Sequence, residues 1–292
     1  MARFGRVITA MVTPFDDRGE LDLDAAARLA QWLTENGSEG LVLAGTTGEG
    51  PVLSQAEVVA LTRRVRDSVE VPILVGTGTN DTAETIELTR RVSDIGIEGV
   101  LVVTPYYSRP SQAGLADHFT QVANSTHLDV VLYDVPVRTG RRIEPETLLT
   151  LARDVDNIVA VKDAANTPTV TAVVAASAPE GFEIYSGEDA MTLPIVAVGG
   201  VGVISVASHW VGRQFQAFFD AIELGDLVEA RRQNARMLPS FAFEGGDETP
   251  NPIPTKAMMR VLGLAVGQCR PPVGVSPAGL EERARELLAG LR

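Results

Sequence analysis

The chain has 292 residues, of which 45% are hydrophobic and 22% charged, and its formal net charge is −13. This composition is typical of a soluble globular protein that can build a core without disulfides. The negative charge argues against nucleic acid or an anionic membrane as a partner, although a local pocket can still bind an anionic substrate.

No apolar run reaches the length of about 18 residues that spans a bilayer. The first residues lead directly into a strand-like run and lack the apolar region of a signal peptide. We therefore expect a cytoplasmic protein without a membrane partner. Cys269 is the only cysteine, so we expect neither an internal disulfide nor a zinc site and predict that Cys269 is structural.

Eight short β-rich runs recur along the chain, with helix-length segments between them. Most are continuously apolar, as in parallel strands that are buried on both faces. This alternation predicts an α/β fold of the (β/α)8 TIM barrel type. A doubly wound open sheet is the alternative, but no Gly-x-Gly-x-x-Gly turn follows the first strand. The predicted strands are Val7–Val12, Gly40–Ala44, Pro72–Gly76, Gly99–Thr104, Asp129–Tyr133, Ile158–Val161, Phe182–Tyr185 and Gly202–Val206.

Helical patterns separate several of these strands, and four more follow the eighth strand without a strand between them. We therefore predict a barrel domain over residues 1–224 and a C-terminal helical domain over residues 225–292. A proline-rich loop, Glu244–Pro254, is expected to lead into a helix at Thr255 or Lys256. The predicted helices are Leu23–Asn36, Ser54–Val69 (with a capping box), Asp81–Ile95, Gly114–Ser125, Gln214–Leu224, Leu227–Leu238, Pro254–Leu262 and Pro277–Leu291.

The predicted sixth strand, Ile158–Val161, is followed directly by Lys162. Only two of the 25 basic residues are lysines, Lys162 and Lys256, and the others are arginines. An amine can lose its proton and attack a carbonyl, whereas guanidinium stays charged. Lys162 is therefore a candidate for a Schiff-base lysine, with a lysine that extends into solvent as the alternative. We assign Lys256 a helix-start or packing role far from any barrel strand.

Chemistry in a barrel gathers at the carboxyl ends of the strands. There, the Gly/Thr-rich turn Gly45–Gly50 offers backbone N–H groups to a phosphate or carboxylate, or is simply a tight turn. Tyr133 can relay a proton, and Arg138 can bind a carboxylate, with a half-buried tyrosine and a surface ion pair as the alternatives. The pair Tyr106-Tyr107 on a loop fits a subunit-interface or packing role at least as well as a role in the site.

Other candidates are assigned structural roles. The three histidines, His118, His127 and His209, are expected away from the strand ends. Gly199-Gly200 precedes the eighth strand and is read as the turn into it. The strand ends lack an obvious set of convergent carboxylates, so we expect no metal and no other cofactor.

Together these residues resemble the dihydrodipicolinate synthase family, within the pyruvate-dependent class I aldolases. The resemblance spans nearly the whole chain, and although each motif is short, the set in this order is specific. The residues that carry it are Gly45-Thr-Thr-Gly-Glu49, Thr104-Pro-Tyr-Tyr107 with Arg109-Pro110, Tyr133, Pro136 with Arg138-Thr-Gly140, Lys162, Ser186-Gly187, Gly202-Val-Ile-Ser205 and Asn251-Pro-Ile-Pro254.

The resemblance implies a lyase in the diaminopimelate route to lysine. Lys162 would form an imine with pyruvate, and the derived enamine would attack the aldehyde of L-aspartate 4-semialdehyde. It implies the following roles: Tyr133, Thr46 and Tyr107 as a proton relay, Thr46 and Thr47 on the pyruvate carboxylate, Arg138 on the semialdehyde carboxylate, and the Gly187 and Ile204 carbonyls beside the lysine.

Members of the family are usually homotetramers, and in such a tetramer Tyr107 would reach into the neighbouring subunit's site. Related lyases that act on N-acetylneuraminate or 2-keto-3-deoxy sugar acids generally lack an arginine at position 138, because their second substrate is a polyol. Such a lyase is the alternative function, and a non-catalytic barrel is a third hypothesis. The sequence does not distinguish a dimer from a tetramer.

The sequence departs from the family pattern at several positions. Asp134, Asp163 and Gly50 stand where many members have Asn, Glu and Ser, and we treat them as variants. Feedback inhibition by lysine would use Asn80, Glu84 and Tyr106, which fit the family pattern. Strongly inhibited members carry histidines at the positions of Gln55 and Val58, so we predict weak inhibition or none.

Overall fold

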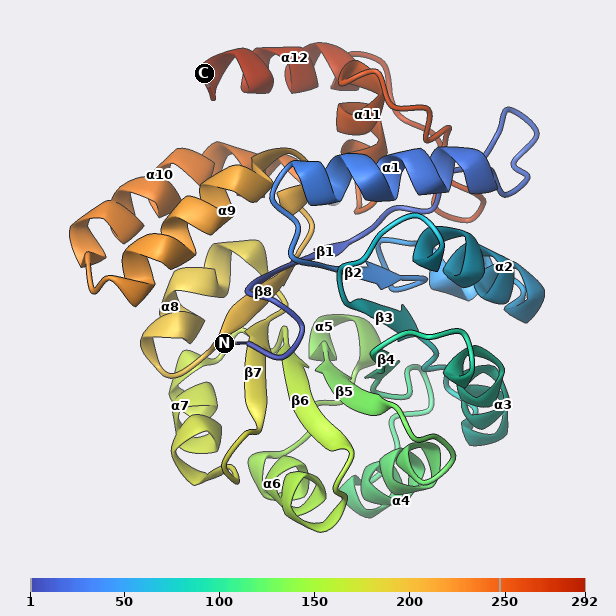
Figure 1. The fold of residues 1–292 in the computed structure, drawn as a ribbon, viewed down its shortest axis with the longest axis vertical. Coiled ribbons are helices and arrows are strands. Elements are labelled where there is room, and N and C mark those ends of the chain that lie inside the picture. Colours follow the sequence, from blue (N-terminus) through green and yellow to red (C-terminus); the bar gives the residue numbers. More distant parts are fainter. Residues whose placement is uncertain (1, 247, 292) are drawn as a thin grey trace. The chain divides into compact units, whose positions relative to one another are not determined.

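The computed structural model describes residues 2–246 and 248–291, and within them eight parallel strands follow one another in chain order around a closed barrel (Figure 1). The predicted TIM barrel is thereby confirmed, with every strand within two residues of its expected bounds. The strands are β1 (Val7–Ala10), β2 (Gly40–Leu43), β3 (Ile73–Gly76), β4 (Gly99–Val103), β5 (Asp129–Asp134), β6 (Ile158–Asp163), β7 (Glu183–Ser186) and β8 (Gly202–Ser205).

The chain forms two compact units. The first comprises Pro72–Ile204 with the residues up to Gly5, and the second comprises Arg6–Val71 with the residues from Ser205 onward. A domain boundary between residues 224 and 225 stays a prediction. Met1 and Arg292, at the ends of the predicted domains, and Asp247, in the predicted proline-rich loop, lie outside the described residues.

In the first unit, helices cover the outer face of the strands (Figure 1). Four of these helices begin where a polar cap or a proline favours them: Asp81 and Ser111 accept backbone N–H bonds at two starts, and Pro145 and Pro168 open two others. The helices are α3 (Thr82–Ser93), α4 (Gln112–Ala123), α5 (Pro136–Thr139), α6 (Pro145–Asp154), α7 (Pro168–Ser177) and α8 (Thr192–Ala197).

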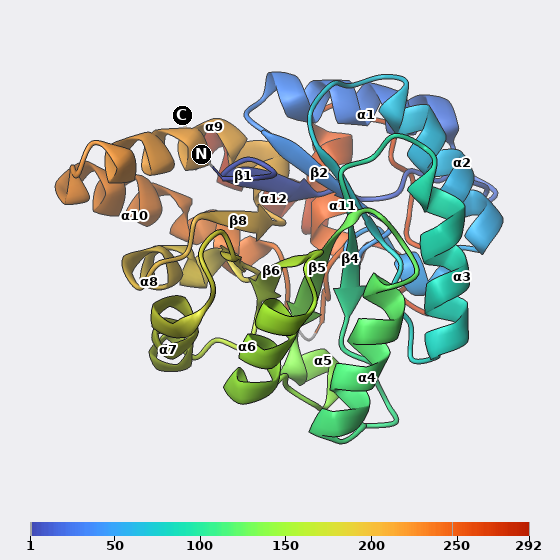
Figure 2. The same cartoon turned by 60° about the horizontal axis from the view of Figure 1, so that its bottom comes forward.

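In the second unit, α9 and α10 run side by side (Figure 2). Trp210 Nε1 donates to Ser240 Oγ at 2.9 Å, and the Phe215 and Phe241 rings stack. Helix α1 packs against α2, and α11 packs against α12. The helices are α1 (Leu23–Glu35), α2 (Gln55–Arg66), α9 (Ser208–Glu223), α10 (Leu227–Phe243), α11 (Ile253–Val261) and α12 (Leu280–Gly290).

Most predicted helices are confirmed, but four bounds differ by three residues or more, among them the end of α2 at Arg66 rather than Val69. Helix α9 begins at Ser208 rather than Gln214, and α12 begins at Leu280 rather than Pro277. Helix α10 continues through Pro239 to Phe243, because the contacts of Ser240 and Phe241 with α9 stabilise its last turn. The predicted capping box at Ser54 is confirmed.

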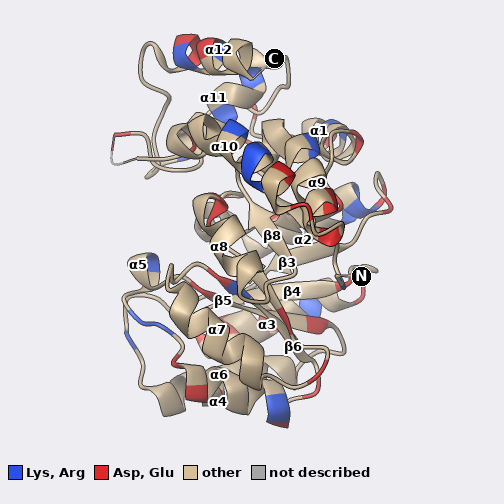
Figure 3. Ribbon diagram, turned by 90° about the vertical axis from the view of Figure 1, so that its left-hand side faces the viewer, with Lys and Arg blue, Asp and Glu red and all other residues tan. Residues whose placement is uncertain are grey.

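The outer surfaces of the C-terminal helices are charged. In Figure 3, α12 carries both acidic and basic residues. Arg285 pairs with Glu281 and Glu282 about one turn away. Among the described residues, no helix is both long and apolar enough to cross a membrane.

Candidate active site

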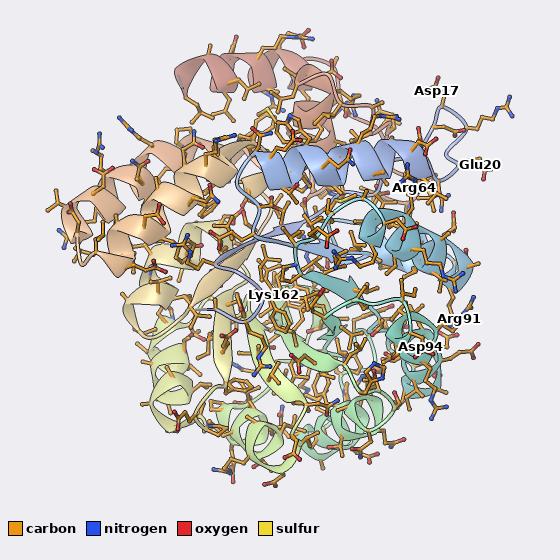
Figure 4. The ribbon with its side chains drawn as sticks, in the orientation of Figure 1. Asp17, Glu20, Arg64, Arg91, Asp94 and Lys162 are labelled. Carbon is orange, nitrogen blue, oxygen red and sulfur yellow. The ribbon has the colours of Figure 1, made fainter. Side chains whose placement is uncertain are left out.

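Lys162 is the last buried residue of β6. The register places it between Tyr133 of β5 and Tyr185 of β7, and only 6% of its surface is exposed. Its Nζ lies 4.3 Å from the centroid of the Tyr133 ring. Figure 4 shows Lys162 on the inner side of the strands, whereas Arg91 of α3 and Asp94, the residue that follows α3, lie on the outside. The amine is therefore held in a sheltered position beside a phenol and does not extend into solvent.

Tyr133 is fixed by its neighbours on both sides. Its register partners are Val103 on β4 and Lys162 on β6. Its carbonyl oxygen accepts bonds from the Thr104 N–H at 3.0 Å and the Thr104 hydroxyl at 3.2 Å. A buried phenol in fixed geometry beside an amine can pass a proton to or from a group bound to that amine.

Gly187 leaves room for the lysine side chain. A Cβ at this position would stand 3.0 Å from Lys162 Cγ, 3.1 Å from its Cε and 2.9 Å from Ala164 Cβ. The Gly187 N–H donates to the Asp163 carbonyl at 2.7 Å, which anchors the backbone beside β6. Ile204 is buried in β8, whose register sets Val203 beside Ser186.

Arg138 lies exposed on the single turn α5, which ends at Gly140 in the left-handed region with φ of 70°. Arg109 Nε donates to the Gly140 carbonyl at 2.9 Å, and Arg141 donates to the Arg109 carbonyl at 3.2 Å. The segment that carries Arg138 is therefore tied to the loop that carries Tyr107.

Tyr107 itself is 91% exposed and has a φ of 71°, which is unusual for a residue with a side chain. Its neighbour Tyr106 is half-buried. Burial and the charge of Glu84 raise the pKa of Tyr106, and a bond from the Asn80 backbone lowers it, with a net rise. The structure thus brings together the three residues that the sequence suggested as a lysine-binding group.

Glu188 is a candidate that the sequence reasoning did not assign. It follows Gly187, and burial is the largest influence on its carboxyl, whose pKa is raised. The charge of Asp189 adds to the rise, whereas the charges of Lys162 and Arg138 oppose it. The charges of Lys162 and Arg138 therefore both act on the carboxyl of Glu188. The three residues come near one another only in the folded chain.

Asp134 and Asp163 end neighbouring strands in register with one another. Asp163 accepts the Ala165 N–H at 2.9 Å and the Thr171 hydroxyl at 2.6 Å, so it orders the loop after β6. Asp134 accepts the Ile143 N–H at 3.1 Å, and burial raises the pKa of its carboxyl to about 7. Both carboxyls therefore have backbone partners in the loops behind the strand ends.

The turn after β2 belongs to the second unit. Two of its residues with side chains, Ala44 and Glu49, have left-handed φ values of 52° and 56°. The turn closes on itself through bonds from the Glu49 N–H to the Thr46 carbonyl and from the Gly50 N–H to the Gly45 carbonyl, both at 3.0 Å. Thr47 is buried, and Thr46 is half-buried.

The role predicted for Lys256 is wrong in one respect. Lys256 lies inside α11 and is buried, as a packing role requires, but its Nζ stands 2.6 Å from Glu49 Oε1 in the turn after β2. It is therefore not remote from the strands. The sequence shows no sign of this pairing, because the two residues come from opposite ends of the chain.

The prediction that the three histidines lie away from the strand ends is wrong for His209, whose Nε2 accepts the N–H of Val12, two residues after β1 ends. His118, whose pKa burial lowers to about 4, bonds to the Thr82 hydroxyl at the start of α3. His127 is exposed, and Cys269 is buried, which raises the pKa of its thiol to about 12. Among the described residues, no group of three or more His, Cys, Asp or Glu side chains is placed to hold a metal.

Comparisons with known proteins point to one family. The model of the dihydrodipicolinate synthetase family matches residues 3–289. A 4-hydroxy-tetrahydrodipicolinate synthase of Acidothermus cellulolyticus is 47% identical over 99% of this chain and 92% of the relative.

Solved structures of similar chains agree. A dihydrodipicolinate synthase of Cyanidioschyzon merolae with lysine bound is 39% identical, with a TM-score of 0.96 over 100% of this chain and 99% of that chain. A chain described as the first monomeric dihydrodipicolinate synthase variant is 35% identical, with a TM-score of 0.94 over 99% of this chain and 97% of that chain.

Proposed function

Because the chain belongs to the dihydrodipicolinate synthetase family, we propose that it is an aldolase-type lyase that condenses pyruvate with L-aspartate 4-semialdehyde. The observation that carries the proposal is the buried amine of Lys162 beside the Tyr133 ring. An amine that is to form an imine must be held against the carbonyl carbon, and a neighbouring phenol suits the proton transfers that follow.

In this proposal the Lys162 amine attacks the ketone carbon of pyruvate, and loss of water gives the imine. Loss of a methyl proton then gives an enamine, which forms the new carbon–carbon bond with the aldehyde. Tyr133, Thr46 and Tyr107 move the protons. Thr46 and Thr47 bind the pyruvate carboxylate, and the Gly187 and Ile204 carbonyls accept bonds beside the lysine.

Arg138 binds the carboxylate of the semialdehyde. Its exposed guanidinium, on a segment fixed by the bond between Arg109 and Gly140, suits bidentate capture of a carboxylate. The second substrate of the alternative reaction is a polyol, which offers hydroxyls instead of a carboxylate at this position. Steady-state assays with the semialdehyde, N-acetylneuraminate and a 2-keto-3-deoxy sugar acid test this assignment. Turnover of only the sugar acids would overturn it.

The same assay on variants tests the role of Arg138. Arg138→Ala should raise the KM for the semialdehyde about 100-fold and leave the KM for pyruvate within about twofold, because a charge-assisted carboxylate bond is lost. The exposed Arg153→Ala on α6 is the matched control. Equal effects of both variants would contradict the role.

We also propose a homotetramer in which Tyr107 completes the site of a neighbouring subunit, and a cytosolic location, which rests on the sequence alone. The exposed phenol at a left-handed backbone position supports the first part, because such a residue is available to a partner. Sedimentation velocity gives the oligomeric state. A monomer that is active would contradict the proposal, because its Tyr107 could act only within its own chain.

A further inference from the structure

The hydroxyl of Thr47 has a partner that the roles above do not use. Asn251, in the segment between α10 and α11, donates from Nδ2 to Thr47 Oγ1 at 2.9 Å. The Thr255 hydroxyl approaches Asn251 Oδ1 at 3.4 Å, which turns the oxygen of the amide toward Thr255 and its NH2 group toward Thr47. All three residues belong to the second unit.

The direction of this bond decides what the threonine can do. A hydroxyl has one hydrogen to donate and lone pairs with which to accept. Because Oγ1 accepts from Asn251, its hydrogen stays free to point to another acceptor. A carboxylate is an acceptor only, so a threonine held in this state is ready to donate to it.

The turn that carries Thr47 needs support from outside. Ala44 and Glu49 both have left-handed φ values, which residues with side chains adopt at some cost. The Glu49 carboxylate is buried, pairs with Lys256 Nζ at 2.6 Å and accepts the Arg270 N–H at 2.8 Å. The Thr13 hydroxyl donates to the Gly48 carbonyl at 2.6 Å.

Lys256 is itself held in place on three sides. Besides Glu49, its Nζ donates to the Gln268 carbonyl at 2.9 Å and lies 4.2 Å from the centroid of the Phe15 ring. Its side chain is 1% exposed and that of Glu49 is 0% exposed. A pair this deeply buried adds little net stability, but breaking it leaves an unpaired buried charge, so it specifies one arrangement of the turn.

We infer that Asn251 directs the Thr47 hydroxyl toward the pyruvate carboxylate, and that the buried Lys256–Glu49 pair holds the turn in which this happens. Both residues are positioning residues, since they act through Thr47 and the turn. The inference rests on the proposed function, because it concerns how the same substrate is bound.

A double-mutant cycle on Asn251 and Thr47 tests the inference. The readout is the pyruvate concentration at which half of the chain is trapped by borohydride. Asn251→Ala and Thr47→Val should each raise it about 10-fold, the typical effect of one lost hydrogen bond to a charged group, and the double variant should be no worse than Thr47→Val alone. If the effects of the two single substitutions multiplied in the double variant, the inference would be overturned. Such a result would show that Asn251 and Thr47 act independently on pyruvate binding.

The variant Asn251→Asp tests whether the direction of the hydrogen bond to Thr47 matters, rather than only the contact between the two residues. Its carboxylate accepts the Thr47 hydroxyl hydrogen and also repels the pyruvate carboxylate. The half-trapping concentration should therefore rise about 100-fold, well above the effect of Asn251→Ala. An Asp variant that binds pyruvate as well as the wild type would overturn the inference.

Lys256→Met tests the support of the turn, with Glu281→Gln as the matched control. The control breaks the Arg260–Glu281 pair between α11 and α12 without touching the turn. If Lys256→Met does not fold, the double variant Glu49→Gln/Lys256→Met is used in its place, because it removes both buried charges. Weaker pyruvate trapping in the Lys256 variant, but not in the control, supports the inference, and equal trapping in both contradicts it.

The two proposals fail differently in this experiment. A wild-type chain that traps no pyruvate at any concentration refutes the proposed function. A wild-type chain that traps pyruvate, with Asn251 variants that trap it equally well, refutes the positioning role alone.

Discussion

Replacing Asp134 by asparagine should remove a pH dependence of stability that the fold builds in beside Tyr133. Asp134 is only 5% exposed, and burial is the main cause that raises the pKa of its carboxyl to about 7. The charges of Asp163 and Glu144 add to this rise, whereas the Ile143 N–H and Arg142 oppose it. An asparagine can still accept the Ile143 N–H through Oδ1.

The sign and size of the effect follow from linkage. The ordinary pKa of the carboxyl is 3.8, so between about pH 4 and pH 7 the folded chain holds a proton that the unfolded chain has lost. The stability from the neutral carboxyl is complete below the unfolded pKa and is lost as the pH rises through the folded pKa. A difference of about 3 pKa units corresponds to about 4 kcal/mol over this range.

Unfolding of the wild type and Asp134→Asn at several pH values measures this difference. Between pH 5 and pH 8 the wild type should lose about 3 kcal/mol relative to the variant, or about 5 °C in Tm. The variant should thus be the more stable chain at pH 8. The exposed Asp154→Asn on α6 controls for a general change of charge. Parallel pH curves for wild type and Asp134→Asn would refute the reasoning.

Three further predictions concern the site. Gly187→Ala should lower kcat/KM for pyruvate at least about 10-fold, because its methyl group would stand 3.0 Å from Lys162 Cγ; an unchanged value would show that the lysine side chain is free to move. Glu188→Gln should raise the KM for the semialdehyde, which carries an ammonium group, and leave the half-trapping concentration of pyruvate unchanged; the reverse pattern would assign Glu188 to pyruvate. Added lysine should inhibit weakly or not at all, because Gln55 and Val58 replace histidines; half-loss of activity below about 1 mM lysine, a binding free energy beyond about −4 kcal/mol, would contradict this.

The strands, and Lys162 as the candidate Schiff-base lysine, could be predicted from the sequence for a physical reason. Parallel strands that are buried on both faces need continuous apolar runs, and these runs stand out between polar segments. Lys162 stands out because the chain otherwise uses arginine almost everywhere. Both signals are local in the chain.

Two of the helices that the sequence analysis did not predict, α5 and α7, lack such a local signal. Helix α7, Thr-Val-Thr-Ala-Val-Val-Ala-Ala-Ser after its first proline, is rich in valine and apolar on most sides, so it shows no clear helical periodicity. Helix α5 is one turn long and is fixed by the Arg109–Gly140 bond, which the sequence does not reveal.

The partners of the site residues were also hidden. Asn251 and Thr47 are 204 residues apart, and Lys256 and Glu49 are similarly distant. Glu188 acquires its significance only because the fold sets it near the charges of Lys162 and Arg138. Single-residue chemistry can be predicted from position at a strand end, but the pairs that orient those residues are set by tertiary structure.

Borohydride reduction in the presence of pyruvate tests the central claim most directly. Peptide mapping by mass spectrometry should find one reduced pyruvate adduct on Lys162, and none in Lys162→Arg. Lys256, the second lysine, is the internal control, because its amine is paired with Glu49. The absence of any adduct, or an adduct on Lys256 alone, would contradict the assignment of Lys162 as the Schiff-base lysine.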